Sequence, residues 1–127
     1  MPEHDSTTAA VMDEVADERR RQHEKWGEQN HPSERPGAWW SGDPGMPARS
    51  RGCADLEIPS EARARGRCAI EAHRGLLTWG DILVEEVSEA IATAHDPAAL
   101  RAELIQVAAV AVAWVECIDR AEEVPRG

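Results

Sequence analysis

The chain has 127 residues, which suggests one domain with a single modest core, and its formal net charge is −10, from 24 acidic and 14 basic residues. This charge disfavours nucleic acid and anionic membranes as partners, so a polyphosphate ligand would need a divalent metal ion to approach. The three cysteines, Cys53, Cys68 and Cys117, form no CxxC pair, and neither a zinc site nor a disulfide framework is indicated.

The N-terminal segment is too acidic and too broken for a signal peptide. No apolar run reaches the roughly 18 residues that a membrane span needs. We therefore expect a soluble, cytoplasmic protein that binds neither membrane nor nucleic acid.

The expected order along the chain is a disordered start over residues 1–8, a single all-α domain over 9–122 and a tail over 123–127. The first helix is expected from about Thr8 to Lys25, with Gly27 as its stop. Residues 32–59 hold five prolines and four glycines, which favour turns and oppose a regular helix. We expect an irregular loop there, which could be a lid, a binding loop or disorder, and whose Trp39 and Trp40 argue mildly against disorder.

Three further helices are expected after this loop. Ser60 opens a short one that Gly75 closes. Thr78 can cap the next, which ends near His95, and Asp96 with Pro97 suits the start of the last, expected from about Ala98 to Glu122. No segment outside the loop alternates with period two, so we expect four helices and no sheet.

The third expected helix carries Glu85, Glu86 and Glu89 within five positions. Its apolar residues recur every three or four positions, and Glu86 and Glu89 lie on the edge of that stripe. Their i, i+3 spacing directs both carboxylates toward one point, whereas Glu85 is directed more toward solvent. A solvated acidic face is the alternative.

The last expected helix is apolar over residues 104–115 except for Gln106, and a helix apolar on all sides is typically buried in a core or a subunit interface. Glu103 shares a face with Val107, Val110 and Trp114. A carboxylate on a buried face is costly unless it is paired or bound to metal. The alternative for Glu103 is an ordinary acidic residue in the first turn, favoured by the helix dipole. The alternative for Gln106 is an amide hydrogen-bonded in the core of a subunit interface.

The short connection around residues 95–98 predicts that these two helices pack antiparallel. Glu103 and Gln106 would then lie within about one helical turn of Glu86 and Glu89. Three or four oxygen ligands at one place suit Mg²⁺, or Mn²⁺, with waters completing the shell.

Two motifs resemble a known family. The pattern Glu85-Glu86-x-x-Glu89 followed by Glu103-x-x-Gln106 resembles the EExxE and ExxD motifs of the all-alpha NTP pyrophosphatases, the MazG-like and dimeric dUTPase group. The stretch RQHEKWGEQNHP, residues 21–32, is similar to the N-terminal segment of phage and actinobacterial MazG-like proteins.

This resemblance implies a four-helix MazG-like bundle completed by homo-oligomerisation as a homodimer or homotetramer, with the Pro/Gly-rich loop between its first and second helices. It implies Mg²⁺-dependent hydrolysis of a (d)NTP to the monophosphate and pyrophosphate. Glu86, Glu89, Glu103 and Gln106 would hold the metal, with Glu85 and Glu86 in catalysis. Gln106 stands where the family has Asp, so the alternative is a weak or inactive nucleotide-binding relative.

The second motif supplies Lys25, Trp26, Gln29 and His31 as candidate substrate-binding residues. The alternative is an ordinary helix end, and we interpret Trp26 as mostly a packing residue. The six arginines between residues 49 and 74 could hold triphosphate oxygens. The interpretation that we favour for them is a solvated face that balances the acids of a partner subunit.

Overall fold

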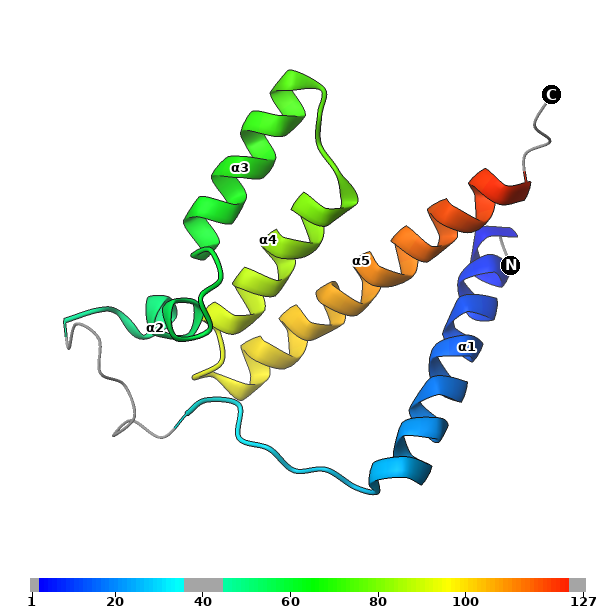
Figure 1. The fold of residues 1–127 in the computed structure, drawn as a ribbon, viewed down its shortest axis with the longest axis horizontal. Helices are drawn as coiled ribbons and strands as arrows, with labels where there is room; N and C mark the ends of the chain where they lie inside the picture. Colours follow the sequence, from blue (N-terminus) through cyan, green and yellow to red (C-terminus); the bar gives the residue numbers. More distant parts are fainter. Residues whose placement is uncertain (1–2, 36–44, 124–127) are drawn as a thin grey trace. The chain divides into compact units, whose positions relative to one another are not determined.

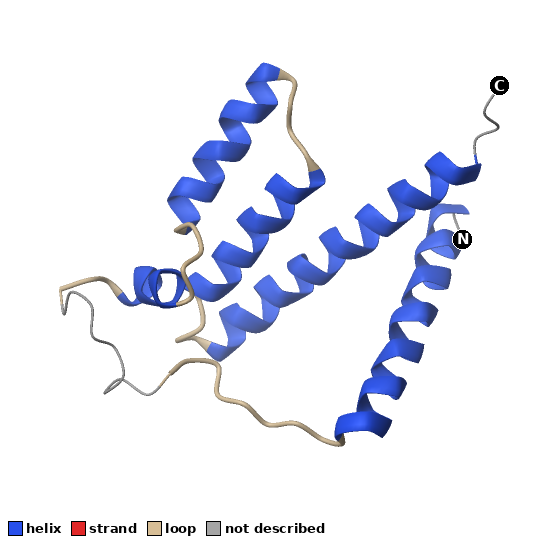
Figure 2. Ribbon diagram, viewed as in Figure 1, coloured by secondary structure: helices blue, strands red, loops and turns tan. Residues whose placement is uncertain are grey.

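The computed structural model describes residues 3–35 and 45–123, and this part of the chain is built from α-helices without a strand (Figures 1 and 2). The helices are α1 (Glu3–Trp26), α2 (Ala48–Asp55), α3 (Glu61–Arg74), α4 (Trp79–Ala92) and α5 (Pro97–Glu123). The all-α prediction is confirmed. The four-helix bundle and its completion by other copies stay predictions.

The chain divides into two compact units. The terminal unit contains Met1–His31 and Ala111–Gly127, and the central unit contains Pro32–Val110. α5 contributes its first half to the central unit and its second half to the terminal unit. In the terminal unit Val11 of α1 and Val112 of α5 are buried, and the Thr8 hydroxyl donates to Glu116 Oε1 at 2.7 Å.

Local signals end α1 and α3 where the sequence predicts, whereas α4 ends at Ala92 rather than near His95. Gly27 follows α1 with a φ of 71°, and its N–H donates to the carbonyl of His23 at 2.7 Å. Gly75 caps α3 with a φ of 73°. Both glycines adopt the left-handed conformation that a side chain disfavours, and this conformation stops a helix.

The predicted starts of α4 and α5 are also confirmed. Thr78 and Asp81 form a capping box at the start of α4, in which each side chain accepts the other residue's backbone N–H at 3.1 Å. Asp96 Oδ1 accepts from the N–H of Ala99 at 3.2 Å, and Pro97 is the first residue of α5. α1 differs from expectation, because it begins at Glu3 rather than near Thr8.

The prediction that residues 32–59 contain no regular helix is wrong for α2, and the structure therefore has five helices among its described residues. The stretch 48–55 contains no proline, and Pro47 occupies the N-cap position, where a missing N–H costs nothing. Packing against α4 then supports the helix. Cys53 is buried and its thiol donates to the carbonyl of Ser88 at 3.5 Å. Residues 36–44, with Trp39 and Trp40, lie outside the described residues.

Small side chains form the core of the central unit, where α4 packs on α2 and α3. Ala64, Cys68, Ala90 and Ala92 are buried. The buried Ser88 hydroxyl donates to the carbonyl of Pro59 at 2.8 Å, which ties the segment before α3 to α4. Small residues let the helix backbones approach closely, so a compact core forms here without Phe or Tyr.

α5 is not covered as its composition predicts. Leu104, Ile105 and Ile118 are each about half exposed, at 49%, 56% and 49%. By length and composition alone, Pro97–Glu122 is apolar enough to cross a membrane, which corrects our expectation that no segment is. Core helices of water-soluble proteins pass the same test, but only 6% of the most apolar window of α5 is buried.

Candidate metal centre

Three carboxylates from two helices meet in the central unit. Glu86 and Glu89 come from α4 and Glu103 from α5, and one oxygen of each lies within 4.8 Å of the others. We call these three residues the carboxylate cluster. All three side chains are partly buried. The sequence predicted this convergence from the i, i+3 spacing and the return of the last helix.

The connection between α4 and α5 explains why the carboxylates meet. Thr93–Asp96 reverses the chain, and two side chains fix it at both ends. The Thr93 hydroxyl donates to the carbonyl of Ala90 at 2.8 Å, and Asp96 caps α5. Glu86 lies as far before the end of α4 as Glu103 lies after the start of α5. The two side chains therefore lie level on helices of opposite direction.

The charged form of Glu86 is disfavoured by its surroundings. Burial raises the pKa of its carboxyl, and the charges of Glu89, Glu103 and Glu85 raise it further. Its Oε2 atom is inaccessible to solvent and has no hydrogen-bond partner among the described residues. A buried acceptor without a partner costs about 1–3 kcal/mol, so the side chain is suited to a cation that would satisfy it.

The donor set fits a hard divalent cation. Carboxylate oxygens are preferred ligands of Mg²⁺ and Mn²⁺, and three like charges at such short range repel unless a cation lies between them. The residues that could hold it are Glu86, Glu89 and Glu103. The identity of the metal stays a prediction.

Glu85 takes a different direction, toward α3. Its carboxylate acts on the Cys68 thiol, whose S–H donates to the carbonyl of Asp81 at 3.2 Å. Burial and this neighbouring carboxylate raise the pKa of Cys68 to about 11. Glu85 therefore belongs to the α3–α4 interface, and its charge is the smallest of the causes that raise the pKa of Glu86. Its catalytic role stays a prediction.

Gln106, the fourth predicted ligand, follows Glu103 on α5 by one turn and is exposed. A glutamine there is neutral, so it could coordinate through its amide oxygen but could not act as a base. An exposed position leaves it free to turn toward the cluster or toward solvent. Its role as a ligand stays a prediction.

The four predicted substrate-binding residues belong to the terminal unit and are exposed. Trp26 is 61% exposed, which corrects its interpretation as a packing residue. The Lys25 ammonium lies 4.9 Å from the centre of the Trp26 ring, within range of a cation–π contact. Lys25, Trp26 and Gln29, but not His31, line a hollow of about 350 Å³ together with Glu18, Arg21 and Gln22.

Three more residues lie beside the cluster, of which the sequence analysis missed Glu61 and named Arg49 and Arg65 only as members of the arginine-rich stretch. Arg49 of α2 binds Glu61 of α3 through two hydrogen bonds of 2.7 Å each. Arg65 of α3 lies 3.7 Å from the Glu61 carboxylate and 3.5 Å from that of Glu89. These two arginines pair with acids of their own chain, and the interpretation that the arginine-rich stretch balances a partner subunit stays a prediction. The i, i+4 spacing of Glu61 and Arg65 was the available signal.

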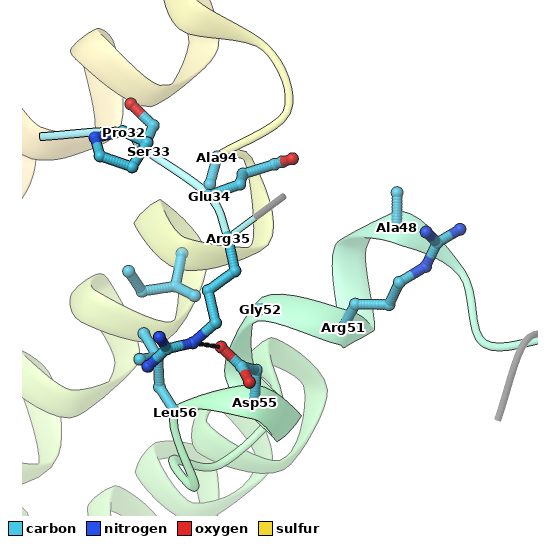
Figure 3. A pocket seen from close by; sticks show the side chains of 11 residues that line it. Pro32, Ser33, Glu34, Arg35, Ala48, Arg51, Gly52, Asp55, Leu56 and Ala94 are labelled. Atoms are coloured by element: carbon cyan, nitrogen blue, oxygen red, sulfur yellow. Dashed lines mark hydrogen bonds and ion pairs between the residues drawn. The ribbon is translucent and has the colours of Figure 1, made fainter. Parts of the chain in front are cut away.

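A cavity of the central unit lies elsewhere, between α2, the end of α4 and the segment before residue 36 (Figure 3). Its volume is about 530 Å³, and an ion pair of 2.6 Å joins Arg35 to Asp55 at its wall. Its lining consists of Pro32, Ser33, Glu34, Arg35, Ala48, Arg51, Gly52, Asp55, Leu56, Ile91 and Ala94. No member of the carboxylate cluster lines this cavity.

Membership of the all-alpha NTP pyrophosphatases rests on the two sequence motifs and stays a prediction. Comparison of the chain with family models, with curated proteins and with solved structures finds no match.

Proposed function

We propose that this chain is a divalent-metal-dependent nucleoside triphosphate pyrophosphohydrolase, which converts a (d)NTP and water to the (d)NMP and pyrophosphate. The observation that supports this most is the convergence of Glu86, Glu89 and Glu103, in which one buried oxygen of Glu86 has no hydrogen-bond partner within the described part of the chain. Such an arrangement costs folding free energy in a protein that leaves it empty.

In this proposal the three carboxylates hold the metal ion and orient the phosphates beside it. A divalent cation bound there would offset the phosphate charge and lower the pKa of water near the scissile bond. Burial and its neighbours raise the pKa of the Glu86 carboxyl in the metal-free protein, and a cation held by this carboxylate would lower that pKa and relieve the repulsion. The acidic surface of the chain, with net charge −10, makes the metal a requirement for polyphosphate binding.

The test is calorimetric titration of Mg²⁺ and Mn²⁺, with pyrophosphate release measured in the same preparations over a panel of dNTPs and NTPs. We expect wild type to bind metal and release pyrophosphate, and Glu86→Gln and Glu89→Gln to lose both. Glu14→Gln, an exposed carboxylate of α1 in the terminal unit, is the control for the change in charge. Turnover that survives both cluster substitutions would rule out this mechanism.

A nucleotide-binding role without turnover is the second candidate, and the neutral, exposed Gln106 favours it. It predicts metal-dependent binding of nucleotide without pyrophosphate release. The discriminating variant is Gln106→Asp, which restores the acidic residue of the motif. Release of pyrophosphate by this variant alone would support the binding role, and an active wild type would exclude it.

We further propose that the exposed apolar residues of α5 are covered by another copy of the chain. Leu104, Ile105 and Ile118 are too exposed for a helix of this composition in water. Light scattering at micromolar concentration should give at least a dimer. A monomer that instead binds to lipid vesicles would assign this face to a membrane.

A further inference from the structure

Two arginines flank the carboxylate cluster, and they are held very differently. The Arg49 guanidinium makes a fork with both oxygens of Glu61, at 2.7 Å each. This geometry is the strongest that an arginine and a carboxylate form. It lowers the pKa of Glu61 and raises that of Arg49. Arg49 is therefore held in a fixed position by Glu61.

Arg65 is held loosely between two acids. Its Nη2 atom lies 3.7 Å from Glu61 and 3.5 Å from Glu89, and its side chain is 60% exposed. Both distances are at or beyond the limit for a hydrogen bond, and exposed ion pairs of this kind contribute little to stability. Because Arg49 already occupies both Glu61 oxygens, Arg65 has no strong partner of its own in this site.

Glu89 is at once a neighbour of Arg65 and a member of the carboxylate cluster. A divalent cation on Glu89 would compete with the guanidinium for the same carboxylate and would repel it. A released guanidinium on an exposed side chain would then lie beside a site that attracts phosphate. Its planar fork of N–H donors matches two phosphate oxygens.

From this geometry, and resting on the function proposed above, we infer that Arg65 is an exchangeable counter-ion. It occupies Glu89 while the cluster lacks metal, leaves it when a divalent cation binds, and then holds the polyphosphate of the substrate. Arg65 is thus a substrate-binding residue whose availability depends on the metal. Arg49 remains on Glu61 throughout.

The experiment measures binding rather than turnover. Mn²⁺ alone is titrated into wild type, Arg65→Gln and Arg63→Gln, and the manganese complex of inorganic tripolyphosphate is then titrated into the Mn²⁺-saturated proteins. Tripolyphosphate probes the phosphate site without a base. Arg63 is the matched control, since it is an exposed arginine of α3 for which no ion pair is found among the described residues. Circular dichroism checks that each variant is folded.

We expect Arg65→Gln to bind Mn²⁺ about threefold more tightly, because it loses a competitor of the strength of an exposed ion pair. The same variant should bind the tripolyphosphate complex about tenfold more weakly, through loss of charge-assisted hydrogen bonds. Arg65→Lys should keep the Mn²⁺ affinity of wild type and regain only part of the tripolyphosphate affinity. Arg63→Gln should match wild type in both titrations.

Weaker Mn²⁺ binding by Arg65→Gln, or unchanged tripolyphosphate binding, would overturn the inference. If wild type binds Mn²⁺ and releases pyrophosphate while Arg65→Gln behaves like Arg63→Gln, the inference alone fails. If neither wild type nor Arg63→Gln binds Mn²⁺, the proposed function fails and the inference fails with it.

Discussion

Replacing Glu86 by glutamine should stabilise the metal-free protein and destabilise the metal-bound one. The substitution removes one of three carboxylate charges that lie within 4.8 Å of one another. It also supplies an amide N–H₂ group, which can donate to the remaining carboxylates. In the absence of metal both changes favour the folded state.

The size of the stabilisation by Glu86→Gln follows from the distance between the carboxylate oxygens of the cluster. Two unit charges 4.8 Å apart repel by about 0.9 kcal/mol at a dielectric constant of 80 and about 3.5 kcal/mol at 20. Glu86 has two such neighbours, and the side chains are only partly buried, so we take the lower part of this range. We expect Glu86→Gln to raise the free energy of unfolding by about 1–3 kcal/mol in EDTA. The melting temperature should rise by about 3–6 °C per kcal/mol.

Saturating Mn²⁺ should reverse this order. A cation at about 1,000 times its dissociation constant stabilises the folded wild type by about 4.1 kcal/mol, which exceeds the gain expected for the variant in EDTA, and the variant, lacking a ligand, should gain little from Mn²⁺. The assay is thermal or urea unfolding of wild type, Glu86→Gln and the charge-matched Glu14→Gln, each in EDTA and in Mn²⁺. A variant less stable than wild type in EDTA would refute the electrostatic reasoning. Equal stabilisation of all three proteins by Mn²⁺ would refute the metal site.

Three further outcomes are expected. In EDTA the stability of wild type relative to Glu86→Gln should fall as the pH rises from about 4.3, the unperturbed value for glutamate, through the raised pKa of Glu86, because the folded state binds that proton more tightly than the unfolded state; urea titrations in which the two proteins change in parallel with pH would contradict it. Gly52→Ala should cost about 1–3 kcal/mol by overpacking, since its Cβ would lie 2.9 Å from an α4 side chain, whereas Gly66→Ala in open space should stabilise by about 0.5–1 kcal/mol; urea unfolding in which both variants shift alike would count against that contact. Cys68, with its pKa raised to about 11, should react with iodoacetamide at pH 8 at least 100-fold more slowly than a free thiol, and Glu85→Gln should speed the reaction; mass spectrometry showing no change would remove the carboxylate as a cause.

The helix ends were predictable because their causes are local. A glycine with positive φ stops α1 and another stops α3, and a capping box starts α4. Each signal involves residues within four positions of one another, so the sequence alone contains it. The convergence of Glu103 on Glu86 and Glu89 needed only one more step, the short connection between α4 and α5.

What could not be predicted depends on contacts between distant segments. α2 has weak helix signals of its own, and its burial of Cys53 against α4 is a tertiary effect. The position of Arg49 at the cluster follows from α2 and was missed for the same reason. Trp26 is exposed although tryptophan is usually well buried, because burial depends on which neighbours a helix end meets. Composition does not contain that information.

The surroundings of the carboxylate cluster depend on Gly52, a residue that contributes no atom to the cluster. The absence of a side chain at Gly52 lets α2 approach α4 closely. Because a short helix moves as a nearly rigid unit, this distance between the helices also determines where Arg49, one turn earlier, meets Glu61. A methyl group added at residue 52 would push α2 away from α4 and draw the Arg49 guanidinium away from Glu61. The position of the Arg49 guanidinium relative to Glu61 thus depends on the lack of a side chain at residue 52.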